Sequence, residues 1–531
     1  MSKLGRATAV MTLGTVLSRV TGLLRLAAIT AALGVVESKL PDTYNLANTA
    51  PNIIYELVLG GILTSVFVPV FVELLEKEGR ERAWAVASAI INVSLVVLTA
   101  ITALGILATP LIARFYASSL GADQAAVQEE VLSALLPLFI PQIIFYGLTA
   151  ITAGLLNAHK RFGAPMYTPI LNNLSVIAIF IGFYNAYGAV DLESITTTQT
   201  LIIGLGTTSG VALMAISQLP FLRGLGRYRF TFSMRHSSIR KIAKLSVFVI
   251  GYVITNQLGY LVVQKLANGV DGGYTAYISA FTFFLLPHGL FAVSVITSLL
   301  PDMSRHAINE RWSEFREGLS TGVRATAMLV LPAAVGYFVL SEPIVTLLKR
   351  GVVTAESVDL VSGVLRFFVL GLVPFSLFQL FLRAFYALHD TKTPFLINCG
   401  AVALNTAVNI PMFLWLGVKG LAAGHAIAYT FGSVVQGRAL RGRIGGLDGA
   451  RIAASVARIG SAALGMGVVV FGVLRGVASF VDTSAPGGAA IAVIIPVTAG
   501  VGVYAALAIA LKVPELGFIR NLAGRKAAPP R

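Results

Sequence analysis

Fourteen long apolar segments dominate the sequence, and they constrain the chain to span a membrane. A helix of about 20 apolar residues crosses the roughly 30 Å hydrocarbon core of a bilayer. Because backbone polar groups find no water there, only helices and closed barrels can span it, and these segments are too long for barrel strands. We therefore expect an all-α polytopic protein with about 14 transmembrane helices. The expected spans are 7–36, 41–74, 84–116, 128–157, 164–187, 198–222, 240–266, 275–300, 318–348, 358–388, 394–416, 420–440, 452–478 and 486–511.

Composition agrees with this class and excludes several others. Charged residues make up 12% of the chain, about half the share in a soluble domain. The single cysteine, Cys399, excludes a disulfide framework and a thiolate zinc site. There is no P-loop, HExxH or nucleophile elbow, and no loop is long enough for a catalytic domain. The sequence therefore favours a membrane transporter over an enzyme.

The charges of the loops predict the orientation of the chain. Lysine and arginine concentrate in the loops after the even-numbered spans and at both ends, whereas the alternate loops are mostly acidic or neutral. The positive-inside rule then places both termini in the cytoplasm. This bias and attraction to anionic lipid explain the net charge of +16 without a nucleic-acid partner. The basic stretch 223–244 also suits phosphate headgroups, although we favour an ordinary cytoplasmic loop.

An internal repeat predicts how the helices are grouped. The segment 157–173 after the fourth span resembles 386–398 after the tenth, and their prolines, Pro165 and Pro394, lie 229 residues apart. A second pair of segments, 63–69 and 296–301, also joins a span to the one six spans later. The repeat predicts two parallel six-helix lobes around a central cavity, an arrangement typical of alternating-access transporters. The predicted parts are a first lobe 1–225, a second lobe 226–445, two C-terminal helices in 446–515 and a cytoplasmic tail 516–531.

Two arginines lie inside the first apolar segment. Arg19 is roughly 20 Å beyond Arg6 along a helix, where a charge costs on the order of 3 kcal/mol or more unless it faces a wet, protein-lined cavity. An anionic guest is expected there, since guanidinium groups bind phosphates through paired hydrogen bonds. Ser18 lies nearly on the face of Arg25, and Arg19 lies about 120° round the helix. The alternative is that each arginine only pairs with an acid or a helix C-terminus.

The segment around these arginines resembles a known family. Ser-Arg-Val-Thr-Gly-Leu-Leu-Arg at 18–25 is similar to the SRxxGxxR signature of the MurJ (MviN) lipid II flippases in the MOP exporter superfamily. Further resemblance lies in 42–52, 61–69, 161–173 and 389–394, and it covers about residues 5–440. The Tyr-Glu-Leu-Val-Leu-Gly-Gly stretch that begins at Tyr55 is similar to the actinobacterial branch.

The resemblance implies a function and a set of site residues. It implies transport of lipid II, a polyprenyl diphosphate-linked peptidoglycan precursor, from the inner to the outer leaflet of the bacterial plasma membrane. Membrane phospholipids and cell-wall synthesis proteins would be its neighbours. Arg19, Arg25 and Ser18 are the expected substrate-binding residues, and Asp42 matches an acidic residue near the outer gate. Three departures predict a less basic cavity than in other members: Leu26, the Tyr55-Glu56 pair and Thr282.

Other polar residues in the spans leave alternatives open. Glu56 either neutralises Arg19 or Arg25 at the gate between substrates or pairs within its lobe. Asn405 and Asn409 share one helix face, which suits a Na⁺ site or, more commonly, hydrogen bonds between helices. No other metal site and no cofactor are expected, and uphill transport would draw on membrane potential or an ion gradient. The alternative functions are another MOP exporter, for a drug or a different polyprenyl-linked saccharide, and a non-transporting scaffold of cell-wall synthesis.

Overall fold

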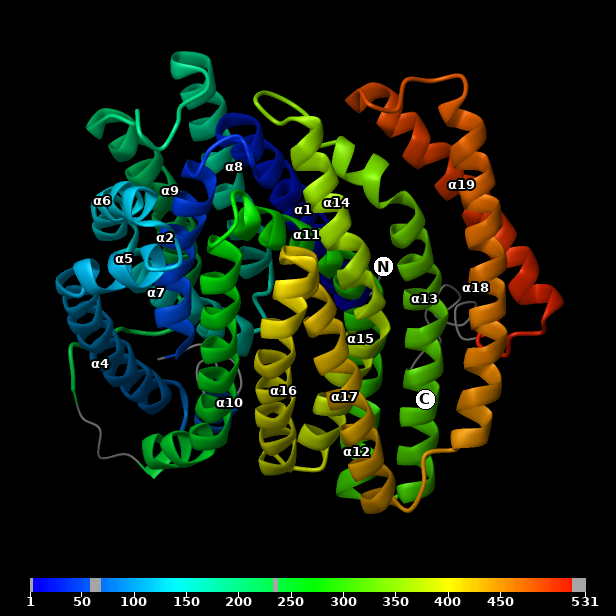
Figure 1. Cartoon of the computed structure of the whole chain (residues 1–531). Coiled ribbons are helices and arrows are strands. Elements are labelled where there is room, and N and C mark those ends of the chain that lie inside the picture. The colour runs from blue at the N-terminus through cyan, green and yellow to red at the C-terminus, as the bar shows by residue number, and fades with distance from the viewer. Residues whose placement is uncertain (1–2, 58–67, 233–236, 518–531) are drawn as a thin grey trace. The chain divides into compact units, whose positions relative to one another are not determined.

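The computed structural model describes residues 3–57, 68–232 and 237–517, which form helices joined by short loops with no strand among them. The all-helical fold class is therefore confirmed. The helices, shown in Figure 1, are α1 (Lys3–Leu33), α2 (Leu40–Tyr55), α3 (Val68–Lys77), α4 (Arg80–Leu107), α5 (Thr109–Ala117), α6 (Ala122–Phe139), α7 (Gln142–Ala158), α8 (Gly163–Tyr187), α9 (Thr197–Gln218), α10 (Ser237–Asn268), α11 (Gly273–Pro287), α12 (Val293–Ile308), α13 (Trp312–Thr346), α14 (Ala355–Leu370), α15 (Leu372–Ala387), α16 (Lys392–Leu416), α17 (Val418–Ile444), α18 (Gly449–Ala478) and α19 (Pro486–Ala510), with a 3₁₀ turn η3 (Leu219–Leu222) and a π-helical turn η4 (His288–Ala292).

Ten helical segments in the described part of the chain are long and apolar enough to cross a membrane. The number becomes eleven if α14 and α15, which are bent by 49°, form one broken span. The protein is thus a multi-pass membrane protein, and the number fourteen stays a prediction. Each of the fourteen predicted segments nevertheless contains at least one helix. The segment 41–74 includes residues 58–67, which lie outside the described residues.

Prolines account for several breaks within the predicted spans. Pro110 lies in the first turn of α5, and Pro141 directly precedes α7. A proline lacks the N–H that would continue the preceding helix, and its ring clashes with the turn before it. Pro374 likewise follows the break at Gly371, between α14 and α15. Pro287 ends α11 immediately before the π-helical turn.

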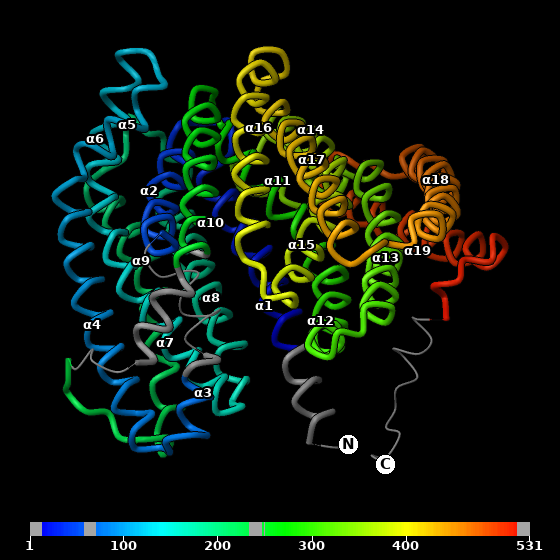
Figure 2. The backbone as a smooth tube through the Cα atoms, turned by 90° about the horizontal axis from the view of Figure 1, so that it is seen from below, coloured from blue at the N-terminus to red at the C-terminus, as the bar shows by residue number. Residues whose placement is uncertain are grey.

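Contacts divide the chain into two units, one ending at Thr275 and the other beginning at Ala276. In the first unit, α8 packs between α1 and α9, and α2 and α7 pack on each other. In the second, α13 is the central helix and contacts α12, α14, α15, α18 and α19 (Figure 1). Figure 2 shows α16 beside α17, and α18 beside α19, in the same unit. This division differs from the predicted lobe boundary at residue 225, mainly in the placement of α10, and the lobes themselves stay a prediction.

A buried ion pair anchors the segment after α19 to the second unit. Arg324 of α13 donates from Nη1 to Glu515 Oε1 at 2.5 Å, and each residue is 4% exposed. Ser455 of α18 donates to the other carboxylate oxygen at 2.6 Å. Because all three groups are buried and bonded, this contact fixes the end of the described chain against α13 and α18.

The sequence repeat recurs in the backbone. α8 and α16 each contain 25 residues, and each ends at a glycine with positive φ, Gly188 at 67° and Gly417 at 59°. The turns before these helices also match, since Lys160 and His389 have φ values of 59° and 56°. Lys160, Gly188 and both ends of α8 each lie 229 residues before their counterparts in the second repeat.

The hydrogen bonds of the two turns are equivalent as well. In the first, N–H groups of residues 160 and 161 bond to the carbonyls of residues 157 and 156 at 2.9 and 2.8 Å. In the second, residues 389 and 390 bond to residues 386 and 385, both at 3.0 Å. This pattern is the Schellman motif, which turns the chain sharply after a helix. The repeated sequence therefore encodes a repeated helix–turn–helix geometry.

In the second turn a side chain adds to the backbone pattern. Asp390 accepts hydrogen bonds from the N–H and the hydroxyl of Thr393 at 3.0 and 2.6 Å, which caps the start of α16. It also forms an ion pair with Arg443, near the end of α17. The 389–394 signature thus holds the α15–α16 turn against α17.

Candidate functional site

The first helix packs along α8 through small and polar residues. Only glycine fits closely at Gly14, where an added Cβ would lie 3.0 Å from the Cβ of Met166. One turn further, the side-chain amide of Asn173 donates to the carbonyl of Ser18 at 3.3 Å and to the hydroxyl of Thr21 at 3.0 Å. Ser18 therefore contributes its backbone to helix packing. Its predicted role in substrate binding stays a prediction.

The two arginines of α1 have different surroundings. Arg19 is exposed, and its side chain makes no ion pair or hydrogen bond with the described residues. Arg25 is half-buried, and its guanidinium interacts electrostatically with the hydroxyls of Tyr44 on α2 and Tyr146 on α7. Within the described chain, neither arginine has the acidic partner that a purely structural role would call for. Both remain available to an anion.

A row of polar groups continues inward from Arg25. The hydroxyl of Tyr44 lies 2.8 Å from that of Thr207 on α9. Tyr146 donates to Gln142 at 3.2 Å, and Gln142 in turn donates to the hydroxyl of Thr208 at 3.0 Å. These bonds satisfy buried polar groups in the first unit and hold both tyrosine hydroxyls in place. Arg25 is thus positioned by a fixed hydroxyl-bearing wall rather than by a carboxylate.

Glu56 lies at the C-terminal end of α2 and is half-buried. No ion pair joins it to Arg19 or Arg25 among the described residues, and the next residues of the chain, 58–67, are outside that set. Its predicted role at a gate stays a prediction.

A cluster of buried polar groups lies at the start of α2. We call it the clamp, and its members are Lys39, Asp42, Asn268, Val270 and Thr275. Asp42 is 0% exposed and accepts hydrogen bonds from the N–H and the hydroxyl of Thr275 at 2.8 and 2.7 Å. Its second carboxylate oxygen lies 3.0 Å from the ammonium of Lys39. That ammonium also donates to the carbonyls of Asn268 and Val270 at 2.7 and 2.8 Å. The clamp therefore joins α2 to the end of α10 and the first turn of α11.

Amide side chains extend the clamp to α6. Gln128 exchanges hydrogen bonds with Asn268 at 3.0 and 2.8 Å and donates to the hydroxyl of Thr43 at 3.1 Å. Asn268 also donates to the carbonyl of Tyr116 at 3.0 Å. Gln128 and Asn268 are both 0% exposed. These bonds pair the amide groups of both side chains, as a buried polar network requires.

Of the clamp residues, the sequence predicts only Asp42 as a site residue. Nothing in the sequence pattern marks Gln128, Asn268 and Thr275 as its partners. One local signal was available: Lys39 and Asp42 are three residues apart at a predicted helix start, the spacing of an ion pair on one face.

The predicted cation site lies in the second unit. Asn405 and Asn409 pair with each other through their side-chain amides at 3.1 and 3.4 Å, within α16. Asn409 is 0% exposed and lies against α17. A Cβ added at Gly424 of α17 would be 2.0 Å from the side-chain oxygen of Asn409. No group of three or more His, Cys, Asp or Glu side chains suited to a metal occurs in the described residues. A Na⁺ site at this asparagine pair stays a prediction.

Comparisons with known proteins identify the family. The family model described as lipid II flippase MurJ matches residues 29–486. A probable lipid II flippase MurJ from Rhizobium tropici is 30% identical over 417 residues, covering 77% of this chain and 76% of the relative. The lipid II flippase MurJ of Burkholderia cenocepacia is 27% identical over 439 residues, with 81% and 82% covered. The matched range begins after Arg19 and Arg25, so the assignment does not depend on them.

Solved structures show the same fold. A lipid II flippase MurJ in an inward closed conformation has a TM-score of 0.75 at 23% identity, covering 96% of this chain and 99% of that one. An inward-facing multidrug resistance MATE family transporter of the MOP superfamily has a TM-score of 0.64 at 14% identity, covering 81% and 94%. With the family match over most of its length, the chain belongs to the MurJ family of lipid II flippases.

Proposed function

We propose that this protein is a lipid II flippase that carries the precursor across the cell membrane by alternating access. The family match over residues 29–486 carries the proposal. The shared fold supports it, since the structural relatives are transporters. The protein is accordingly a membrane transporter and not an enzyme.

The arginines of α1 suit the charged part of this substrate. Lipid II presents a diphosphate, which needs several hydrogen-bond donors and positive charge in a site that also excludes lipid tails. Arg19 is exposed and unpaired within the described residues, and Arg25 is held beside the hydroxyls of Tyr44 and Tyr146. Arg19 would capture the headgroup, and Arg25 with these hydroxyls would orient it while the polyprenyl tail stays in the bilayer.

The clamp suits an outer gate. Lys39 and Asp42 belong to the first lobe predicted from the repeat, whereas residues 268–275 belong to the second. If these lobes rock against each other, the hydrogen bonds of Asp42 and Lys39 to residues 268–275 must break. The contact-based first unit, which ends at Thr275, includes all the residues of the clamp. Loop charges predict that this end faces outward, so the closed clamp corresponds to a state closed to the outside.

The remaining predictions belong to the same proposal. Membrane potential or a cation gradient would supply the energy, with Asn405 and Asn409 as the candidate cation ligands. Both termini would lie in the cytoplasm. Phospholipids would surround the apolar helices, and cell-wall synthesis proteins would use the delivered precursor.

The test measures lipid II at the outer surface of cells depleted of their own flippase. Wild-type protein should restore exposure, and Arg19→Ala should not, although it inserts normally. Arg475→Ala is the matched control, because Arg475 is also an exposed arginine of an apolar helix but lies outside the repeat. No restoration by well-inserted wild type would favour another polyprenyl-linked substrate, and equal restoration by Arg19→Ala would remove this arginine from the substrate path.

A further inference from the structure

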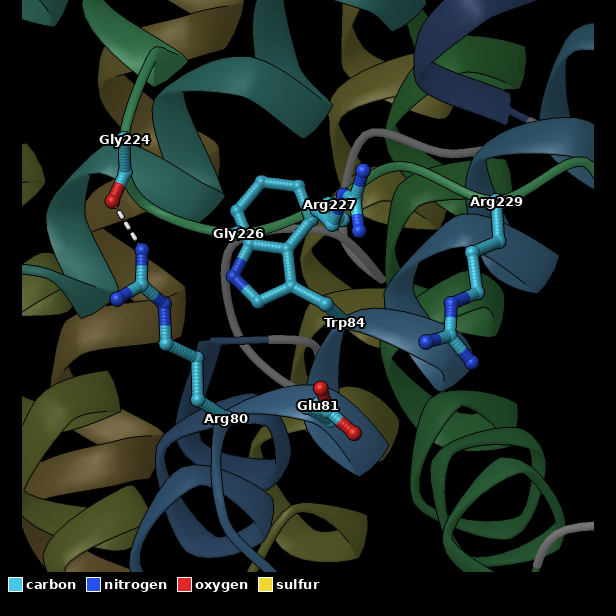
Figure 3. A pocket seen from close by; sticks show the side chains of 7 residues that line it. All are labelled: Arg80, Glu81, Trp84, Gly224, Gly226, Arg227 and Arg229. Carbon is cyan, nitrogen blue, oxygen red and sulfur yellow. Dashed lines mark hydrogen bonds between the residues drawn. The ribbon is translucent and has the colours of Figure 1, made fainter.

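A second basic site lies in the first unit, away from α1 and from the clamp. A pocket of about 440 Å³ is formed between the start of α4 and the segment that follows η3. Three arginines and one glutamate line it, so its net charge is +2. Figure 3 shows Trp84 in the middle, with Arg80 to one side and Arg227 and Arg229 to the other. The lining residues are Arg80, Glu81, Trp84, Gly224, Gly226, Arg227 and Arg229.

The segment that carries Arg227 and Arg229 is fastened along α4. Arg80 donates from Nε to the carbonyl of Leu225 at 2.6 Å and from Nη2 to that of Gly224. Further along, the N–H of Arg229 donates to the hydroxyl of Ser88 at 3.1 Å. Asn92 donates to the carbonyl of Thr231 at 2.8 Å. We call residues 224–232 the strap, and these bonds give it a fixed position.

The strap fits tightly over Trp84. An added Cβ at Gly226 would lie 2.2 Å from two atoms of the indole ring, so only glycine allows this approach. Trp84 is 4% exposed, and its Nε1–H has no hydrogen-bond acceptor in the described structure. The indole ring therefore forms a buried wall under the strap, and its N–H presents no surface to a ligand.

The charges of the pocket select an anion. The guanidinium groups of Arg227 and Arg229 are exposed and have no ion-pair or hydrogen-bond partner among the described residues. Both project from the strap, whereas Arg80 donates from Nε and Nη2 to strap carbonyls. The two exposed guanidinium groups therefore form a donor set suited to phosphate oxygens.

The aromatic residues of the strap point to a lipid rather than to a soluble phosphate. Tyr228 and Phe230 alternate with Arg227 and Arg229, and Phe232 follows Thr231; the three rings are 54%, 79% and 47% exposed. Aromatic side chains are enriched where a membrane protein meets the headgroup layer. A strap that alternates arginine with exposed aromatic residues would place the rings among acyl chains and the arginines at the phosphates. In solution, three such rings would instead be exposed to water.

We propose that the strap pocket binds the headgroup of an anionic phospholipid at the predicted cytoplasmic surface. Arg227 and Arg229 bind the phosphodiester, and the aromatic rings of the strap lie against the acyl chains. This site is distinct from the one proposed for the transported precursor. Its test does not involve transport, so it can fail while the flippase assignment stands.

The experiment measures lipid retention by the purified full-length protein, using native mass spectrometry after exchange into micelles with phosphatidylglycerol or phosphatidylcholine. Each arginine near a membrane surface contributes about 1 kcal/mol, so Arg227→Gln with Arg229→Gln should weaken phosphatidylglycerol binding by about tenfold or more. The control is Arg223→Gln, which removes one positive charge beside the strap but outside the pocket and is compared with Arg227→Gln and Arg229→Gln made singly.

Three outcomes would overturn the proposal. The first is equal retention of phosphatidylglycerol by the double variant and by Arg223→Gln. The second is equal retention of the two lipids by the wild type. The third is displacement of phosphatidylglycerol by millimolar inorganic phosphate, which would assign the pocket to a soluble anion. Selective retention that is lost in the double variant and kept in the control would support it. Circular dichroism and size-exclusion chromatography confirm that each variant is folded.

Discussion

Replacement of Asp42 by Asn should open the outer clamp. Asn has the same shape and keeps one acceptor oxygen for Thr275, but it removes the negative charge from a site that is 0% exposed. The ammonium of Lys39 remains, since the carbonyls of Asn268 and Val270 still accept its hydrogen bonds. The change therefore weakens the clamp without removing its other members.

The size of the effect follows from the bonds that change. Hydrogen bonds to a charged group contribute about 1.5–3 kcal/mol, whereas neutral ones contribute about 0.5–1.5 kcal/mol. Asp42 accepts two bonds from Thr275, so the closed state should lose about 2 kcal/mol relative to the open one. That free energy corresponds to a shift of about 30-fold in the ratio of open to closed molecules. Loss of the ion pair with Lys39 should destabilise the closed state further.

Accessibility from outside the cell measures this ratio. Thr49 lies two turns beyond Asp42 on α2, and its hydroxyl accepts a hydrogen bond from Tyr274 at 3.1 Å. A Thr49→Cys variant, in a background with Cys399→Ser, gives one thiol behind the clamp. Its reaction with a membrane-impermeant maleimide should be faster by up to about 30-fold when Asp42→Asn is added.

Asp271→Asn is the matched control for this experiment. Asp271 also faces the ammonium of Lys39, at 3.6 Å, but its side chain is 64% exposed. Removal of its charge should therefore change the labelling rate little. An unchanged rate in a well-folded Asp42→Asn protein would refute the idea that the clamp closes the outer end. An equal increase with Asp271→Asn would show that general charge, rather than the buried bonds, controls access.

Three further predictions concern the second unit. Arg324→Ala leaves the Glu515 carboxylate buried without its partner, so thermal unfolding in detergent should show a loss of about 3–5 kcal/mol, most of it recovered when Glu515→Leu is combined with Arg324→Met. At Asp390, burial opposes the charge, but hydrogen bonds from Thr393 and the ion pair with Arg443 outweigh it and hold the pKa below its ordinary value of 3.8. The resulting stabilisation is complete above about pH 4 and is lost as the pH falls through the lowered pKa. Asp390→Asn should therefore lower the free energy of unfolding by about 1 kcal/mol at pH 7 and make it less dependent on pH below 4. His425 contacts several aromatic rings, and its buried Nε2 has no hydrogen-bond partner in the described residues, so His425→Phe should leave the Tm unchanged or raise it, whereas His425→Ala should cost about 3 kcal/mol.

The helices could be predicted because each depends on a local property. A long apolar segment forms a helix in a membrane whatever its neighbours are. The cost of a charge in lipid is also local, so Arg19 is expected in a cavity, and this stays a prediction. The breaks at Pro110 and Pro141 are also local, but a proline within an apolar span does not by itself separate a kink from a break. Prediction therefore succeeded for the segments and remained open for the number of spans.

The clamp could not be predicted because its members are far apart in the sequence. Asp42 and Thr275 are separated by 233 residues, and Gln128 and Asn268 by 140. Polar residues such as these have no periodicity that marks them as partners, and their meeting depends on how α2, α6 and α10 pack. The same holds for Arg324 and Glu515, which are 191 residues apart. The partners of these buried polar residues are therefore known only from the structure.

The structure also separates two kinds of residue within the signatures that indicated the family. Asn173 binds α1 to α8, and Asp390 caps α16 and pairs with Arg443, so their polar groups are already bonded within the protein. Such groups can offer little to a substrate, since binding would first have to break those contacts. Arg19 is different, because it has no bonded partner in the described chain. Substitutions that alter which headgroup is carried should therefore fall on α1, whereas those in the repeated turns should alter stability.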